Sequence, residues 1–236
     1  QEEDDFLLNA DDFLSACTED IDLVIICNPN NPTSSAIQTG DMERIIRECK
    51  KRNIFVMIDE TYVEFAPCIE EITAIPLTKR YDNLMVIRGV SKFYAAPGLR
   101  FGYGITSSEA FLKSLHQHQN PWSLNSVGAY TGELMLKDTD YFRETRALIL
   151  SERERMFARL SHMGGYKPYA AYGNFILVRI LKEGLTSFDV FEAAIKNRLM
   201  IRDCSSFESL TGEYIRFCIM NPEDNDRLLH VLNSLI

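Results

Sequence analysis

Apolar runs alternate with helical patterns through the first half of the chain. Four runs read as strands: IDLVIICN (21–28), NIFVMIDE (53–60), NLMVIRG (83–89) and RFGYGIT (100–106). The first run is continuously apolar, which predicts a strand buried on both faces of a sheet, and the second has the same character. Strands separated by helices indicate an α/β domain whose sheet is mostly parallel.

Residues 39–52 form the clearest early helical pattern. Thr39 is the predicted N-cap. Helical spacing places four apolar side chains on one face: Met42, Ile45, Ile46 and Cys49.

The second half has a different pattern, typical of a small α+β unit. Residues 138–163 predict a long charged helix that ends at Gly164-Gly165. The elements expected after it are a strand at 174–180, a helix at 187–198 with Ser187 as N-cap, short strands at 199–203 and 213–220, and a last helix from Pro222.

These patterns predict three parts. Residues 1–118 would be a partial large domain, residues 119–163 a connecting segment with the long helix, and residues 164–236 a small C-terminal domain. The sequence starts at Gln1 without an initiator Met and shows no signal peptide. We therefore expect it to begin partway through a longer protein.

Composition narrows the function classes. The net charge of −9 predicts a surface that repels phosphate backbones, so we expect no nucleic-acid binding. No apolar run approaches about 18 residues, so we expect no membrane span. The six cysteines form no CxxC pair and are interpreted as buried free thiols of a cytoplasmic protein. His116 and His118 would face apart on a helix, so we expect no metal site.

Unusual segments follow three of the predicted strands. CNPNNPT comes after the first, DETY after the second, and RGVSK after the third, followed by PGLRFGY. In open α/β sheets ligands bind beyond the carboxyl ends of the strands. Taken singly, each segment has an ordinary interpretation. The Asn-Pro loop is turn-forming and also permits a cis peptide, Asp59 could cap a helix, and Lys92 and Arg100 could be surface charges.

Together these segments resemble the class I/II aminotransferases of fold type I, which depend on pyridoxal 5'-phosphate (PLP). NPNNPT, DETY, SK and GLRFGY occur in that family's order, with Lys92 and Arg100 eight positions apart. The resemblance runs from about Ile21 to the end of the chain. It implies a large domain of the PLP-transferase type.

The resemblance implies a role for each motif residue. Lys92 would form a Schiff base with the cofactor and later move the substrate's α proton. Asp59 would keep the pyridine nitrogen protonated, which makes the ring a better electron sink. Two further pairs would complete the cofactor site: Asn31 and Tyr62 at the phenolic oxygen, and Ser91 and Arg100 at the phosphate.

Two more arginines are implied to bind substrate. Arg216, in EYIRFCIM, matches the arginine that grips the α-carboxylate of a small amino substrate, and Arg202 would be a second anion contact. A homodimer is also implied by the resemblance.

The chain departs from the family's pattern in three places. Ser34 stands where NPTG has glycine, and Gly89 stands where relatives often have Ser or Thr. The family's N-terminal third has no counterpart here. It carries the helix N-terminus that cradles the phosphate and the aromatic ring that stacks on the cofactor.

Several functions stay open from the sequence. SKFYAAPGLRFGYGI, NPWSLN, IRDCSSF and YIRFCIM are similar to the branch of histidinol-phosphate aminotransferases and threonine-phosphate decarboxylases. We place transamination slightly ahead of decarboxylation. A nucleotide-binding module would need GxGxxG or GxxxxGK[ST] after the first strand, and neither is there. An inactive structural or binding module is the remaining alternative.

Overall fold

The computed structural model describes residues 2–236, which fall into two compact units. The large unit consists of Leu7–Asn30 and Ala36–Phe142. The small unit consists of the residues up to Phe6, Asn31–Ser35 and Arg143–Ile236. Each unit is described by itself below.

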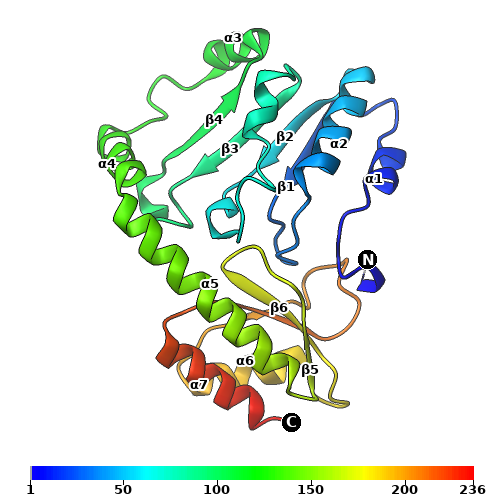
Figure 1. Cartoon of the computed structure of the whole chain (residues 1–236), viewed down its shortest axis with the longest axis vertical. Helices are drawn as coiled ribbons and strands as arrows, with labels where there is room; N and C mark the ends of the chain where they lie inside the picture. Colours follow the sequence, from blue (N-terminus) through cyan, green and yellow to red (C-terminus); the bar gives the residue numbers. More distant parts are fainter. Residues whose placement is uncertain (1) are drawn as a thin grey trace. The chain divides into compact units, whose positions relative to one another are not determined.

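A four-stranded sheet forms the centre of the large unit (Figure 1). Its strands are β1 (Leu23–Cys27), β2 (Phe55–Asp59), β3 (Leu84–Gly89) and β4 (Gly102–Thr106), in the order β1-β2-β3-β4. The first three are parallel, and β4 runs antiparallel to β3. The predicted α/β class with a mostly parallel sheet is confirmed.

Helices α1 (Ala10–Ala16) and α2 (Thr39–Lys51) supply much of the core of this unit. The four predicted apolar side chains of α2 are all fully buried. The predicted cap is wrong by one residue: Gln38 is the N-cap, without a side-chain bond, and Thr39 is already helical. Thr39 instead lies near the carbonyl oxygens of Glu70 and Thr73.

The core covers only one face of this sheet. In β1, Ile26 is buried, whereas Leu23 is 47% and Ile25 62% exposed. The prediction that residues 21–28 are buried on both faces is therefore wrong. In β2 as well, buried Val56 and Ile58 alternate with half-buried neighbours. Because alternate side chains point to opposite faces, β2 presents one face to the core and the other toward solvent.

The rest of the large unit comprises α3, α4, the first residues of α5 and three short 3₁₀ helices. These are α3 (Glu109–His118), α4 (Ser126–Lys137), η2 (Val63–Phe65), η3 (Ile75–Lys79) and η4 (Pro97–Leu99). Helix α3 stacks Phe111 on Phe55 at a ring distance of 4.5 Å. Neither α1 nor α4 was predicted from the sequence. Helix α1 is short, and two glycines interrupt the helical pattern of α4.

The small unit contains a second, antiparallel sheet. Its strands are β5 (Tyr166–Pro168), β6 (Phe175–Ile180), β8 (Tyr214–Cys218) and β7 (Arg202–Asp203), in that order. β5 was not predicted, and β7 is shorter than the expected 199–203.

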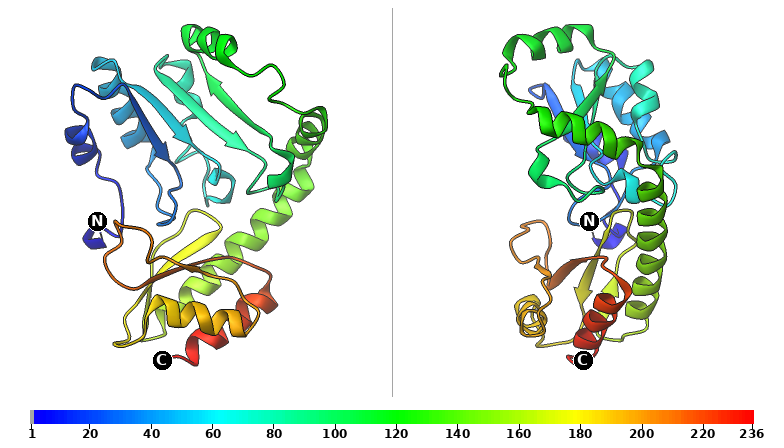
Figure 2. Two further views of the ribbon diagram at one scale, coloured as in Figure 1. Left: turned by 180° about the vertical axis from the view of Figure 1, so that it is seen from behind. Right: turned by 90° about the vertical axis from the view of Figure 1, so that its left-hand side faces the viewer.

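Three helices accompany this sheet (Figure 2): α5 (Thr139–Ser161), α6 (Ser187–Lys196) and α7 (Pro222–Asn233). α5 belongs to the large unit up to Phe142 and to the small unit from Arg143. Ser187 is not the N-cap of α6. Thr186 caps it and forms a reciprocal capping box with Asp189. The helices predicted at 138–163, at 187–198 and from Pro222 correspond to α5, α6 and α7.

The first described residues pack onto the small sheet. Glu2, in η1 (Glu2–Asp4), accepts a hydrogen bond from the Tyr169 hydroxyl at 2.7 Å and pairs with Arg179 at 2.5 Å. Burial alone would raise the pKa of Glu2, but hydrogen bonds from Tyr169, Arg179 and Tyr214 outweigh it and lower the pKa to about 2. Phe6 adds an edge-to-face contact with Tyr169 at 5.0 Å.

The cysteines and histidines depart in part from expectation. All six cysteines are free, but only Cys49 and Cys204 are buried, while Cys27 and Cys218 are exposed. The interpretation of all six as buried thiols is therefore wrong. His116 and His118 lie on α3, and no group of metal-ligating side chains occurs within residues 2–236. Over the same residues, no helix combines the length and apolar character needed to cross a bilayer.

Candidate functional site

Lys92 lies in the segment that follows β3. Its side chain is exposed, and its Nζ is 5.5 Å from the centroid of the Tyr62 ring. That distance is within the range of a cation–π contact. Tyr62 immediately precedes η2, which begins after the end of β2. The structure therefore brings together two predicted site residues from the carboxyl ends of neighbouring strands.

Asp59 is the last residue of β2 and is half-buried. Its Oδ1 accepts a hydrogen bond from the Thr61 backbone N–H at 3.0 Å. In the sheet register it is the partner of Cys27 on one side and Ile87 on the other. Asp59 alternates with the buried Ile58, so its carboxylate points to the face that the core leaves open.

Ser91 and Arg100 lie on either side of a tight loop. Ser91 is half-buried beside Lys92, and Arg100 is exposed at the end of η4. Arg100 has a left-handed backbone, with φ of +53°, and its Nη1 donates to the Pro97 carbonyl at 3.1 Å. A guanidinium has five N–H donors in a planar fork, so this exposed group retains donors for an anion.

An aromatic cluster fixes the backbone next to Lys92. Phe93 is 1% exposed and packs against Phe65 at 5.1 Å and Phe142 at 5.2 Å between ring centroids. The Tyr141 hydroxyl donates to the Phe93 carbonyl at 2.8 Å. Because Phe65 comes three residues after Tyr62, the cluster also links the segments that carry Tyr62 and Lys92.

In the small unit, Arg216 lies on β8 and contacts Asn31. Its Nη1 donates to the side-chain oxygen of Asn31, and its guanidinium carbon is 5.0 Å from the centre of the Phe175 ring. Its Nε is buried without a hydrogen-bond partner. No carboxylate among the described residues forms a salt bridge with Arg216. Arg216 as a whole is half-buried, and a partly desolvated cation without a counter-ion suits an incoming anion.

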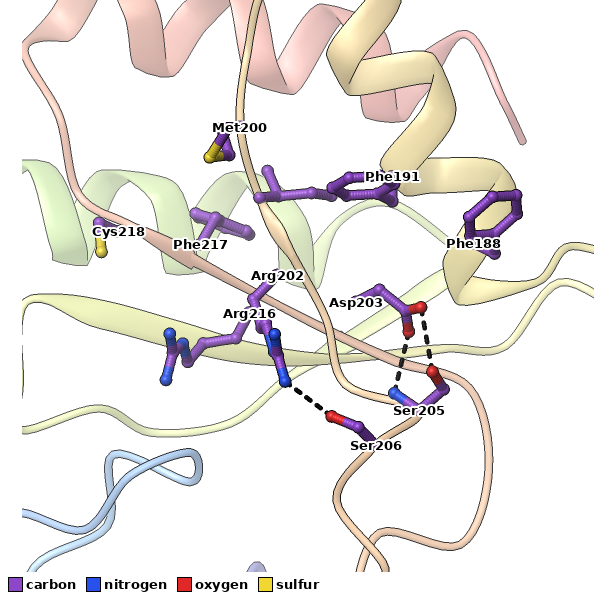
Figure 3. Close-up of a pocket in the computed structure, with 11 residues that line it drawn as sticks. Phe188, Phe191, Met200, Arg202, Asp203, Ser205, Ser206, Arg216, Phe217 and Cys218 are labelled. Carbon is purple, nitrogen blue, oxygen red and sulfur yellow. Dashed lines mark hydrogen bonds between the residues drawn. The ribbon is translucent and has the colours of Figure 1, made fainter.

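Arg202 is the β7 neighbour of Arg216 in the sheet register. Its Nη2 donates to the Ser206 hydroxyl at 2.6 Å, and its guanidinium lies 5.5 Å from the Phe207 ring centre. Both arginines line a cavity of about 640 Å³ in the small unit (Figure 3). Figure 3 also shows the aromatic rings of Phe188 and Phe191 in its wall. The cavity thus combines positive charge with apolar surface.

The Asn-Pro loop is held by a second loop of the small unit. Ser34 is buried with φ of +61°, and its hydroxyl oxygen accepts from the Gly173 N–H at 2.9 Å. The Gly173 carbonyl in turn accepts from Arg153 Nη1 at 2.7 Å. Burial lowers the pKa of Arg153 to about 10, with a smaller contribution from Arg146. The peptide bonds before both prolines, Asn28-Pro29 and Asn31-Pro32, are cis.

A buried ion pair in the large unit was missed by the sequence reasoning. Glu60, next to Asp59, is 0% exposed and bonds Arg88 of β3 at 2.7 Å. The sequence contained a signal for this pair, because Glu60 and Arg88 lie at the ends of two neighbouring apolar runs and carry opposite charges. The interpretation of the DETY motif assigned roles only to Asp59 and Tyr62.

The predicted site residues fall in both units. The large unit carries Asp59, Tyr62, Ser91, Lys92 and Arg100. The small unit carries Asn31, Arg202 and Arg216. Within the large unit the structure brings Lys92 to Tyr62, and within the small unit it brings Asn31 to Arg216. The assignment of these residues to cofactor and substrate remains a prediction.

Comparison with known proteins adds a family match. The family described as "Aminotransferase class I and II" matches residues 1–232. A threonine-phosphate decarboxylase from Salmonella typhimurium is 32% identical over 226 residues, which cover 96% of this chain and 61% of that protein. The chain spans about 60% of the length of the curated relatives that it matches.

Solved structures have the same fold. The histidinol-phosphate aminotransferase from Clostridium acetobutylicum superposes with a TM-score of 0.91 at 30% identity, over 98% of this chain and 68% of that one. The corresponding enzyme from Sinorhizobium meliloti, solved in complex with pyridoxal-5'-phosphate, has a TM-score of 0.84 at 22% identity. That match covers 97% of this chain and 62% of the other.

Proposed function

Because the chain belongs to the aminotransferase class I and II family, we propose that the protein is a PLP-dependent aminotransferase in which Lys92 holds the cofactor. The substrate would be an amino acid or a phosphorylated amino compound. One observation carries the proposal: the Lys92 amine lies 5.5 Å from the Tyr62 ring, and Asp59 ends the strand that leads to Tyr62.

The residues present fit PLP chemically. PLP offers an aldehyde, a pyridine nitrogen, a phenolic oxygen and a phosphate. The large unit supplies an exposed amine (Lys92), a carboxylate on the open sheet face (Asp59), a phenol (Tyr62) and an exposed guanidinium (Arg100). When bound, PLP supplies an electron sink for the substrate's α-carbon.

Each large-unit residue then has a specific task. Lys92 binds the cofactor covalently and moves the proton at the α-carbon. Asp59 keeps the pyridine nitrogen protonated by charge pairing. Tyr62 hydrogen-bonds the phenolic oxygen. Ser91 and Arg100 bind the phosphate, the latter through its bidentate fork.

The small-unit arginines would bind substrate. Arg216 lines the cavity, where a substrate carboxylate or phosphate would pair with its guanidinium. Arg202, in the neighbouring strand, would bind a second anionic group. Two arginines in one cavity favour a substrate with two anionic groups.

Absorbance spectroscopy tests the role of Lys92. Adding PLP to the purified protein should produce the visible band of lysine-bound cofactor. Lys92→Ala should abolish this band, while Lys113→Ala, which removes an exposed lysine of α3, should retain it. A band that survives in Lys92→Ala would show that another amine holds the cofactor. Absence of the band in the unaltered protein would instead favour the inactive-module alternative.

Steady-state kinetics test Arg216. A charge-assisted hydrogen bond contributes about 1.5–3 kcal/mol, so Arg216→Lys should lower kcat/KM roughly ten- to a hundredfold. Lysine keeps the charge but loses the planar fork. Unchanged kcat/KM for every substrate would exclude Arg216 as the anion anchor.

Decarboxylation is the second candidate, favoured by the 32% identity with the Salmonella decarboxylase. Amino donors with and without phosphate should be assayed in two ways. Formation of a carbonyl product measures transamination, and release of CO₂ measures decarboxylation. Amino-group transfer without CO₂ supports the aminotransferase, and stoichiometric CO₂ supports the decarboxylase. We further propose that the protein is a homodimer, the assembly that the family resemblance implies.

A further inference from the structure

We propose that Glu60 and Arg88 form a positioning pair that holds the Asp59–Tyr62 segment and the Lys92 segment in the geometry needed for cofactor binding. This inference rests on the proposed function. Neither residue is among those assigned above to cofactor or substrate.

Glu60 is buried, Arg88 is largely buried, and several hydrogen bonds join them to each other and to their neighbours. The Glu60 side chain is 0% and the Arg88 side chain 14% exposed. Arg88 donates to Glu60 Oε2 from Nη2 at 2.7 Å and from Nε at 3.0 Å. Glu60 Oε1 accepts from the Ala74 N–H at 2.5 Å. Thr73 donates its hydroxyl to Glu60 at 2.9 Å and accepts from Arg88 at 3.0 Å. Such a network is rigid because every partner is fixed by another.

The pair lies next to the proposed site residues in the chain, so it can fix their positions. Glu60 follows Asp59 directly, and its backbone continues the β2–β3 pairing through a bond from its N–H to Ile87 at 2.9 Å. Its carbonyl accepts from Val63 at 3.0 Å, which starts the turn containing Tyr62. Arg88 is four residues before Lys92. The ion pair therefore clamps the ends of β2 and β3 where their functional segments depart.

The pair acts from the opposite face of the sheet. Adjacent residues in a strand point to opposite faces, so buried Glu60 points to the core while half-buried Asp59 points to the open face. Arg88 has the same relation to Ile87, the sheet partner of Asp59. Glu60 and Arg88 are therefore positioning residues rather than catalytic ones. Because Arg88 is paired with Glu60, its charge does not compete for Asp59. The Asp59 carboxylate can then pair with the pyridine nitrogen.

The test compares Glu60→Gln, Arg88→Gln and the double variant with Lys50→Gln, which breaks the exposed Lys50–Asp82 pair in the same unit. Two quantities are measured by absorbance: the dissociation constant for PLP and the pH midpoint of the visible band. Each single variant should bind PLP on the order of tenfold more weakly and shift the midpoint. The double variant should be no worse than the poorer single, because neither charge is left unpaired. Lys50→Gln should match the unaltered protein.

Folded single variants with unchanged affinity and unchanged midpoint would overturn the proposal. So would weaker binding with an unchanged midpoint, since that is the result of a merely structural role. If both Gln variants fail to fold, Arg88→Lys, which keeps the charge but not the two-nitrogen contact, is judged by the same two measurements. Failure of the unaltered protein to give a PLP band, or survival of the band in Lys92→Ala, would count against the proposed function itself.

Discussion

Ser34 shows how one residue can depart from a family pattern at low cost. It stands where the family motif has glycine, and its φ of +61° is one that glycine adopts without penalty. Its hydroxyl offsets the strain by accepting the hydrogen bond from Gly173. Serine lacks the conformational freedom of glycine, but its side chain gains a hydrogen bond from a loop that is distant in the sequence.

Two substitutions separate these opposing effects. Ser34→Ala loses the bond but retains the strain and should destabilise the protein by about 1–2 kcal/mol. Ser34→Gly also loses the bond but relieves the strain, so its destabilisation should be smaller. Urea unfolding of both variants measures the difference. Equal losses would mean that the left-handed backbone carries no cost here.

Glu2 provides a residue-scale prediction about pH. Its folded pKa of about 2 lies below the usual 4.5, so its contribution to stability is complete above about pH 4.5 and is lost as the pH falls toward 2. Glu2→Gln should therefore be less stable than the unaltered protein at pH 6, and the gap should narrow below pH 4.5. Thermal unfolding from pH 6 to pH 3 checks this. A gap that does not change with pH would contradict it.

At the scale of elements, helix caps illustrate what the sequence pattern leaves undecided. Apolar spacing correctly located the buried face of α2 and the existence of α6. The cap predicted for α6, Ser187, is wrong by one residue, since Thr186 is the cap. Both are good capping residues, and in the structure the Ser187 hydroxyl donates instead to Asp203. Similarly, the apolar run at 21–28 predicted a strand but could not reveal that Leu23 and Ile25 would be exposed.

The capping box of α6 should be measurable. Thr186→Ala removes the bond to the Asp189 N–H and should cost about 1 kcal/mol of unfolding free energy. Thr211→Ala, in an exposed loop, serves as the control and should stay within about 0.5 kcal/mol. Chemical denaturation distinguishes the two. An equal effect of both substitutions would argue against the reciprocal cap.

At the scale of the molecule, the motifs identified residues that the structure brings together, Tyr62 and Lys92, but not the ion pair beside them. Asp59, Tyr62 and Lys92 were expected because motif residues follow neighbouring parallel strands. The Glu60–Arg88 pair depends on which charged side chain turns toward the core, and that follows from the one-sided packing of the sheet. Apolar spacing alone does not specify that packing.

One segment of the large unit exposes many apolar side chains, which is typical of an interaction surface. They are Leu115, Trp122, Leu124, Val127, Tyr130, Leu134 and Leu136. Trp122, the sole tryptophan, is 89% exposed. If the proposed homodimer uses this surface, the fluorescence emission of Trp122 should move to shorter wavelength as the protein concentration rises.

Sedimentation in parallel with fluorescence checks this prediction. Val127→Asp should keep Trp122 intact but place a charge among these side chains, so emission should stay water-like and the protein monomeric. Dimerisation without any change in Trp122 emission or acrylamide quenching would place the contact elsewhere.

The membership of Asn31–Ser35 in the small unit has a consequence for biosynthesis. Ser34 bonds a residue 139 positions later, and Asn31 one 185 positions later. On a ribosome, this loop would therefore emerge well before the segments that carry its two partners. Contacts so distant along the chain form late and slowly, so Arg216 could bond Asn31 only after 185 further residues had been synthesised.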